Sequence, residues 1–199
     1  MSVNLQKGQK VNLKKNDKEE LKRIMVGLGW DEVEQKKGLF GFLKTTYDID
    51  CDASAILCKN GKLGDFSEDV VFYNNLRHST GAVVHQGDNL TGAGDGDDEQ
   101  IFVNLGTIPS EYDRIVFVVT IYQATERKQH FGLIQNAFIR ICDETSGTEF
   151  CKFNLSENYN GQTAMICGEM IKTDGEWKFN AIGQGTNDNG ILAIAKRFQ

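Results

Sequence analysis

The stretch Arg-Ile-Val-Phe-Val-Val-Thr-Ile-Tyr, residues 114–122, decides the fold class of this chain. It is almost continuous in apolar and β-branched residues, which is typical of a strand buried on both faces. It is also far shorter than the roughly 20 apolar residues that a membrane-spanning helix needs. A strand of this kind lies inside a sheet, so the flanking sequence is expected to supply further strands.

The flanking sequence does contain short segments that alternate apolar and polar residues, the period of a half-buried strand. Asp174-Gly175 is a two-residue hairpin signal between two such segments, and Thr145-Ser146-Gly147 separates another two. Glycine occurs 21 times and proline once, so glycine builds many of the turns. We therefore expect about nine or ten strands. Besides 114–122, strands are predicted over 24–28, 47–57, 69–73, 82–85, 100–105, 137–142, 149–154, 163–173 and 176–182. A loop is predicted over 31–46, a short helix or a loop over 123–130, and a helix over 190–198.

This pattern predicts an all-β fold, a β-sandwich of two antiparallel sheets with short peripheral helices. The 199 residues are expected to form a single domain, 1–199.

The composition excludes several classes of protein. The 28 acidic residues exceed the 22 basic ones, a net charge of −6, which argues against a nucleic-acid partner. The N-terminal ten residues contain no apolar signal segment, which favours a cytoplasmic location. The five cysteines form no CxxC pair, so we expect reduced thiols packed as small hydrophobic groups.

The acidity is concentrated in two short segments, of which the first is the run 87–99. Its sequence, Gly-Asp-Asn-Leu-Thr-Gly-Ala-Gly-Asp-Gly-Asp-Asp-Glu, holds five carboxylates interleaved with glycines. Carboxylates packed this closely repel one another, and a hard divalent cation removes the repulsion. Calcium takes six to eight oxygen ligands, including the carbonyls that a glycine-rich loop offers, and suits this run better than magnesium. The interior residues and the strand-like flanks do not fit an EF-hand.

The second acidic segment is Asp48-Ile49-Asp50-Cys51-Asp52. On a strand, its three aspartates point to one face while Ile49 and Cys51 point to the other. A row of carboxylates on one face is costly unless water or a cation covers it. Because the chain also carries the acidic run, we predict that the two segments share one or two metal sites.

Several motifs together resemble the TerD family of bacterial tellurium-resistance and general stress proteins. They are VGLGWDE (26–32), DIDCDASA (48–55), HQGDNLTGAGDGDDE (85–99), DRIVFVVTIY (113–122), FGLIQNAFIRI (131–141) and GEWKF (175–179). They occur in the family's order and span nearly the whole chain, and the long acidic run is the most specific of them.

The resemblance implies a calcium-binding β-sandwich with a role in stress response and tellurite resistance. It implies two calcium ions as the cofactor. Carried over residue by residue, the metal ligands would be Asp48, Asp50 and Asp52 from the strand and Asp88, Asn89, Thr91, Asp97, Asp98 and Glu99 from the loop, with backbone carbonyls from Gly92, Gly94 and Gly96.

Three functional classes stay open at this stage. The first is a non-catalytic calcium-binding stress protein, with other proteins of a stress complex as further partners. The second is a metal-dependent phosphoesterase in which His85 is the best candidate general base, although a strand-end histidine bonded to the loop is the more common arrangement. The third is a calcium-dependent adaptor for a membrane surface or a protein complex, to which the segment Lys36–Phe42 would contribute.

Overall fold

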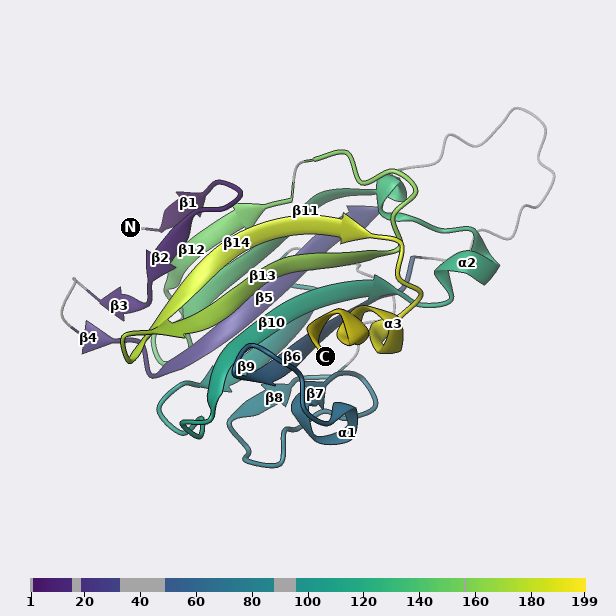
Figure 1. The fold of residues 1–199 in the computed structure, drawn as a ribbon. Helices are drawn as coiled ribbons and strands as arrows, with labels where there is room; N and C mark the ends of the chain where they lie inside the picture. The colour runs from purple at the N-terminus through teal and green to yellow at the C-terminus, as the bar shows by residue number, and fades with distance from the viewer. Residues whose placement is uncertain (1, 16–18, 33–48, 88–95, 156) are drawn as a thin grey trace, which may run out of the picture.

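Two six-stranded sheets pack face to face in the computed structural model (Figure 1), which describes residues 2–15, 19–32, 49–87, 96–155 and 157–199. The first sheet has the order β1-β12-β11-β5-β9-β8 and the second the order β2-β14-β13-β10-β6-β7. The strands of the first sheet are β1 (Val3–Leu5), β5 (Arg23–Glu32), β8 (Val83–His85), β9 (Glu99–Asn104), β11 (Ile134–Asp143) and β12 (Glu149–Asn154). Those of the second are β2 (Lys10–Asn12), β6 (Cys51–Lys59), β7 (Val70–Val71), β10 (Tyr112–Ile121), β13 (Ala164–Thr173) and β14 (Glu176–Thr186).

The remaining elements are short. A two-stranded sheet pairs β3 (Lys14–Lys15) with β4 (Glu19–Glu20), and the helices are α1 (Phe66–Asp69), α2 (Ala124–Arg127), η1 (Phe131–Leu133), α3 (Ile191–Ala195) and η2 (Lys196–Phe198). In the described residues no helix is long and apolar enough to cross a membrane. The predicted β-sandwich with short peripheral helices is confirmed. One pair departs from the antiparallel rule, because β1 runs parallel to β12.

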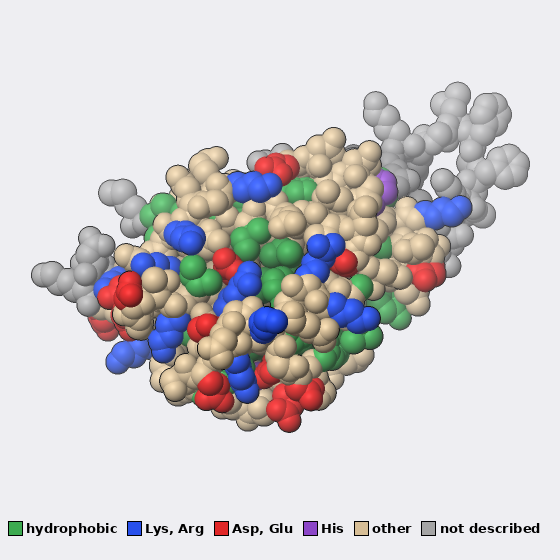
Figure 2. Space-filling view, viewed as in Figure 1, with side chains coloured by type: hydrophobic (Ala, Val, Ile, Leu, Met, Phe, Trp, Pro, Cys, Tyr) green, Lys and Arg blue, Asp and Glu red, His purple; other side chains and the backbone are tan. Residues whose placement is uncertain are grey.

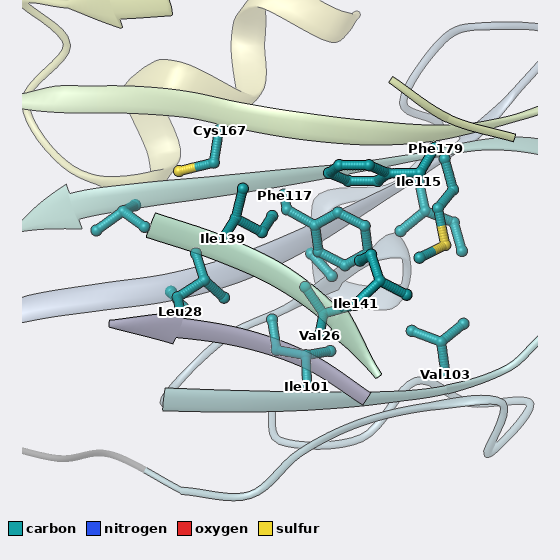
Figure 3. Close-up of a cluster of buried hydrophobic side chains, with 14 of the residues drawn as sticks. Val26, Leu28, Ile101, Val103, Ile115, Phe117, Ile139, Ile141, Cys167 and Phe179 are labelled. Atoms are coloured by element: carbon teal, nitrogen blue, oxygen red, sulfur yellow. The ribbon is translucent and has the colours of Figure 1, made fainter. Parts of the chain in front are cut away.

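The main core lies between the two sheets. Figure 3 shows Val26, Leu28, Ile101 and Val103 of the first sheet facing Phe117 and Phe179 of the second. These side chains sit at alternate positions of their strands, as the period-two pattern requires. Each of them is at most 1% exposed, so this interface supplies much of the apolar area buried on folding.

Strand β10 is buried on both faces, as the sequence predicts. Ile115 and Phe117 belong to the core between the sheets, while Val116 and Val118 belong to a second apolar cluster on the outer face. The residues that cover that outer face come from α3 and η2, namely Ile191, Ile194, Ala195 and Phe198. The C-terminal helices therefore explain why this strand lacks an alternating pattern.

Some predicted elements differ from the observed ones. The segment 69–73 is predicted as a strand, but Asp69 closes helix α1, and only Val70 and Val71 pair with β6. The reason is local, because Asp65 caps the helix by accepting a hydrogen bond from the backbone N–H of Ser67. The predicted strand 47–57 begins at Cys51 and ends at Lys59. Most of the predicted loop 31–46 lies outside the described residues, while Asp31 and Glu32 extend β5.

The hairpin at Asp174-Gly175 is confirmed. Both residues have positive φ, 55° and 83°, the backbone geometry of a type I′ turn. They join β13 and β14, whose register runs from Thr173↔Glu176 to Ala164↔Thr186.

Replacing Phe117 by alanine tests how much the main core contributes to the free energy of unfolding. We expect Phe117→Ala to lower the free energy of unfolding by about 3–5 kcal/mol, because it leaves a cavity at a fully buried site. Leu192→Ala is the control, since Leu192 is 62% exposed and its truncation is expected to cost less than about 0.5 kcal/mol. Urea unfolding measures both. Equal losses in the two variants would contradict the assignment of the core.

Candidate metal centre

The two acidic segments meet at one end of the sandwich, through the side chain of Glu99. This residue is the last of the acidic run and the first of β9, in the first sheet. Its carboxylate Oε2 accepts a hydrogen bond of 2.5 Å from the backbone N–H of Ala53, which follows the acidic strand segment in the second sheet. Both residues are buried. Segments that are 46 residues apart in the sequence are thus joined by a buried hydrogen bond.

Strand β6 offers this bond because, among the described residues, no strand pairs with part of its edge. Strand β7 pairs with β6 only at Ala55 and Ile56. The backbone groups of Ala53 therefore extend beyond the reach of β7, and a buried backbone N–H without a partner is costly. Glu99 satisfies the N–H from the opposite sheet, and His85 approaches the carbonyl, with Nε2 at 3.2 Å from the oxygen of Ala53.

His85 is fixed by contacts on both of its ring nitrogens. Its Nδ1 accepts a hydrogen bond of 3.1 Å from the backbone N–H of Gly87, which assigns the proton to Nε2. That Nε2 lies 3.2 Å from the oxygen of Ala53 and 3.3 Å from Oε2 of Glu99. The arrangement of a strand-end histidine bonded to the loop is confirmed. We call Glu99, His85 and the backbone of Ala53 the edge clamp.

Asp97, another predicted ligand, is paired with an arginine. Its Oδ1 lies 2.7 Å from Nε of Arg140 and its Oδ2 lies 3.0 Å from the second guanidinium nitrogen, a bidentate pair. The side chain of Asp97 is fully buried, and the pair holds the pKa of Arg140 above its ordinary value. A Cβ at Gly27 would lie 2.3 Å from the Asp97 carboxylate, so the glycine on β5 makes room for this pair.

Asp98 lies beside the end of β5. Its Oδ2 accepts a hydrogen bond of 2.7 Å from the backbone N–H of Trp30. Burial raises the pKa of Asp98 above its ordinary value, the bond from Trp30 opposes that shift, and the neighbouring charges of Asp31 and Asp97 add to it. A carboxylate in this environment gains from a nearby cation. Asp31 is not among the metal ligands predicted from the sequence, although it belongs to the motif VGLGWDE.

Of the aspartates in the acidic strand segment, Asp52 lies at the start of β6 and Asp50 directly precedes that strand. Ile49, Cys51 and Ala53 belong to the core between the sheets, so the predicted division of the segment into two faces is confirmed for these residues. Asp52 is buried on the opposite face, which it shares with Ser54. Asp50 lies near α2, with Oδ2 at 3.9 Å from a guanidinium nitrogen of Arg127, and its carbonyl accepts from the N–H of Tyr122.

The other predicted ligands cannot all be placed. The structure describes Gly96, which is exposed and has a positive φ of 122°. Within the described ranges, no group of three or more His, Cys, Asp or Glu side chains is arranged to hold a metal ion. The remaining candidates, Asp48, Asp88, Asn89, Thr91, Gly92 and Gly94, lie outside the described residues. The full ligand set therefore stays a prediction.

The comparisons with known proteins agree with this arrangement of motifs. The model of the TerD domain matches residues 1–198. The chain belongs to the TerD family. Its relatives include the tellurium resistance protein TerD of Serratia marcescens, 47% identical over 100% of this chain and 97% of that protein, and the stress response protein SCP2 of Bacillus subtilis, 46% identical over the full length of both.

Solved structures support the TerD fold. A crystal structure of a homologue of telluride resistance protein (TerD) from Streptomyces coelicolor superposes with a TM-score of 0.65. It covers 90% of this chain and 98% of that one, at 20% identity.

A second buried polar cluster in this TerD chain was missed by sequence reasoning. The hydroxyl of Tyr112 donates a 2.6 Å hydrogen bond to Asp69, and the ring of His78 packs edge-on against Tyr112. Burial, followed by the bond to Asp69, raises the pKa of Tyr112 above its ordinary value. The cluster ties α1 to the start of β10. Its members are separated by up to 43 residues, so no local motif reveals it.

All five cysteines of the chain are free and buried. Burial raises the pKa of Cys58 to about 11 and the pKa values of Cys151 and Cys167 to about 12. Since the thiolate is the reactive form, these thiols are poor nucleophiles at neutral pH.

On the face that carries α3, charged side chains of both signs are interspersed (Figure 2).

The edge clamp predicts a large effect of removing Glu99. In Glu99→Ala, the buried N–H of Ala53 loses its acceptor, so we expect a loss of about 1–3 kcal/mol in the free energy of unfolding, measured in the presence of a chelator. The amide of Ala53 should also exchange its hydrogen faster. Glu126→Ala, at an exposed position, is the control. An unchanged exchange rate at Ala53 would refute the clamp.

The burial of the thiols predicts slow modification. We expect the native protein to react with Ellman's reagent far more slowly than an unfolded sample, in which all five thiols are accessible. The assay compares the protein with and without guanidinium chloride. Rapid stoichiometric labelling of the native protein would contradict the buried, protonated state of the cysteines.

Proposed function

We propose that this chain is a non-catalytic, cytoplasmic calcium-binding protein of the stress response, with a role in resistance to tellurite and related chemical stress. The observation that carries the proposal is the hydrogen bond between Glu99 and Ala53, which joins the acidic run to the acidic strand segment. The names of the relatives, a tellurium resistance protein and a stress response protein, support the biological role.

The donor set fits calcium. Carboxylate oxygens of Asp50, Asp52 and Asp98 and the carbonyl of Gly96 are hard ligands of the kind that calcium takes. Burial, and after it the charges of Asp31 and Asp97, raises the pKa of Asp98 above its ordinary value. Bound calcium would stabilise the ionised form of this carboxylate. Asp97 and Glu99 would then hold the C-terminal end of the acidic run against the two sheets, through Arg140 and Ala53.

Two observations favour a binding protein over a metal-dependent hydrolase. Both ring nitrogens of His85 are engaged with Gly87, Ala53 and Glu99, which leaves this histidine poorly placed to shuttle a proton to a substrate. The cysteines are buried, with raised thiol pKa values, so they are unsuited to act as nucleophiles. Five thiols that form no disulfide also suit a reducing compartment such as the cytoplasm.

The substitution Asp98→Asn is expected to change stability in opposite directions in a chelator and in saturating calcium. Because the pKa of Asp98 is raised on folding, its ionisation costs stability at pH values above the folded pKa and costs nothing below the unfolded one. In a chelator at pH 7, Asp98→Asn should therefore raise the melting temperature, and the gain should shrink as the pH falls toward about 4. The asparagine oxygen can still accept from Trp30.

In saturating calcium the same substitution should lower stability relative to the wild type. Loss of one ligand charge is expected to weaken calcium binding by about tenfold to a hundredfold, roughly 1.4–2.8 kcal/mol. Asp65→Asn is the matched control, because asparagine caps a helix as well as aspartate and Asp65 lies at α1. Calorimetric titration measures affinity and stoichiometry. A shift of the same sign with and without calcium would exclude Asp98 from the site.

A further inference from the structure

A cavity of about 700 Å³ opens at the end of the first sheet, beside a bulge in β11. The register between β11 and β5 shifts between Gln135 and Phe138, and Asn136 has a positive φ of 54°. A bulge of this kind takes residues out of the ladder and bends the strand. The cavity lies at the start of β11, and residues of the two neighbouring strands, β5 and β12, also line it. Its volume is within the range of small-molecule sites.

One wall of the cavity is a fixed aromatic ring with a cation on it. The ring of Phe138 lies over Gly29, where a Cβ would be 2.5 Å from Cζ, so β5 approaches the ring as only a glycine allows. The ammonium of Lys152 lies 3.7 Å from the centroid of that ring. All three residues belong to paired strands, so the wall is held by the sheet.

The carboxylates around the cavity are engaged elsewhere. Asp31 accepts a hydrogen bond of 2.8 Å from Asn136, and Glu157 forms an ion pair of 2.8 Å with Lys7. Within the described part of the chain, Lys152 forms no ion pair, and its close contact is the ring of Phe138.

We propose that this cavity binds a small organic monoanion, with its acidic group at Lys152 and an apolar or aromatic body against the ring of Phe138. The charge of Lys152 selects an anion, with which its ammonium can form a charge-assisted hydrogen bond. The nearby carboxylates of Asp31 and Glu157 disfavour a second negative charge. The site meets the predicted ligands at Gly96 and at Asp98, which accepts from the backbone of the lining residue Trp30. Lys152 and Phe138 are not among those ligands, so the inference does not depend on calcium binding.

A pair of matched dyes tests this inference on the full chain in a chelator. 1-Anilinonaphthalene-8-sulfonate carries one sulfonate on an aromatic body, and N-phenyl-1-naphthylamine is the same body without the charge. We expect the sulfonate to bind with a stoichiometry of one and at least tenfold more tightly than the neutral dye. Lys152→Met should remove that preference while the affinity for the neutral dye changes by less than twofold.

Lys172→Met is the control, because Lys172 lies over the ring of Trp177 outside the cavity and should leave both affinities unchanged. Amide chemical shifts locate the dye, and the expected shifts fall on Gly29 and residues 134–138. Equal binding of the two dyes, an unchanged affinity in Lys152→Met, or shifts confined to the exposed Leu192 would each overturn the proposal. A repeat in calcium separates this result from the metal site, since failure of calcium binding leaves the expected dye results unchanged.

Discussion

The hydrogen bond from the backbone of Ala53 to the carboxylate of Glu99 is the constraint on which the arrangement of this end of the molecule depends. Most of the sandwich is held by apolar side chains between two sheets, and such contacts are tolerant of small shifts. The edge clamp is directional. It fixes the end of the acidic run against the start of β6, and it satisfies backbone groups that β7 leaves uncovered.

A second directional contact holds the run from the other side. Asp97 pairs with Arg140 on β11, in space that Gly27 leaves open, while Asp98 binds the backbone of β5 at Trp30. The three consecutive acidic residues Asp97, Asp98 and Glu99 thus have three different partners in the protein. In our proposal, a cation further stabilises Asp98. Such contacts are what lets a folded protein keep these carboxylates together.

Much of the fold could be predicted from sequence because its signals are local. Three such signals each predict the backbone conformation of the residues that carry them: the alternation at 100–105, the apolar run at 114–122 and the Asp174-Gly175 turn. They correspond to β9, β10 and the β13–β14 hairpin. The parallel pairing of β1 with β12 could not be predicted, since it joins residues about 150 positions apart. The same holds for the partners of the acidic residues. Asp97, Asp98 and Glu99 look alike in the sequence, and only the folded chain distinguishes the partner of Arg140 from the partner of Ala53.

The central claim is that the acidic run and the acidic strand segment form one unit. The most direct measurement is a residue-resolved calcium titration by ¹H–¹⁵N NMR, following the amides of Asp50–Ala53 together with those of Gly96–Glu99. The account predicts that both groups of amides shift and that they report the same dissociation constant. Shifts confined to one group, or two unrelated titration curves, would contradict it.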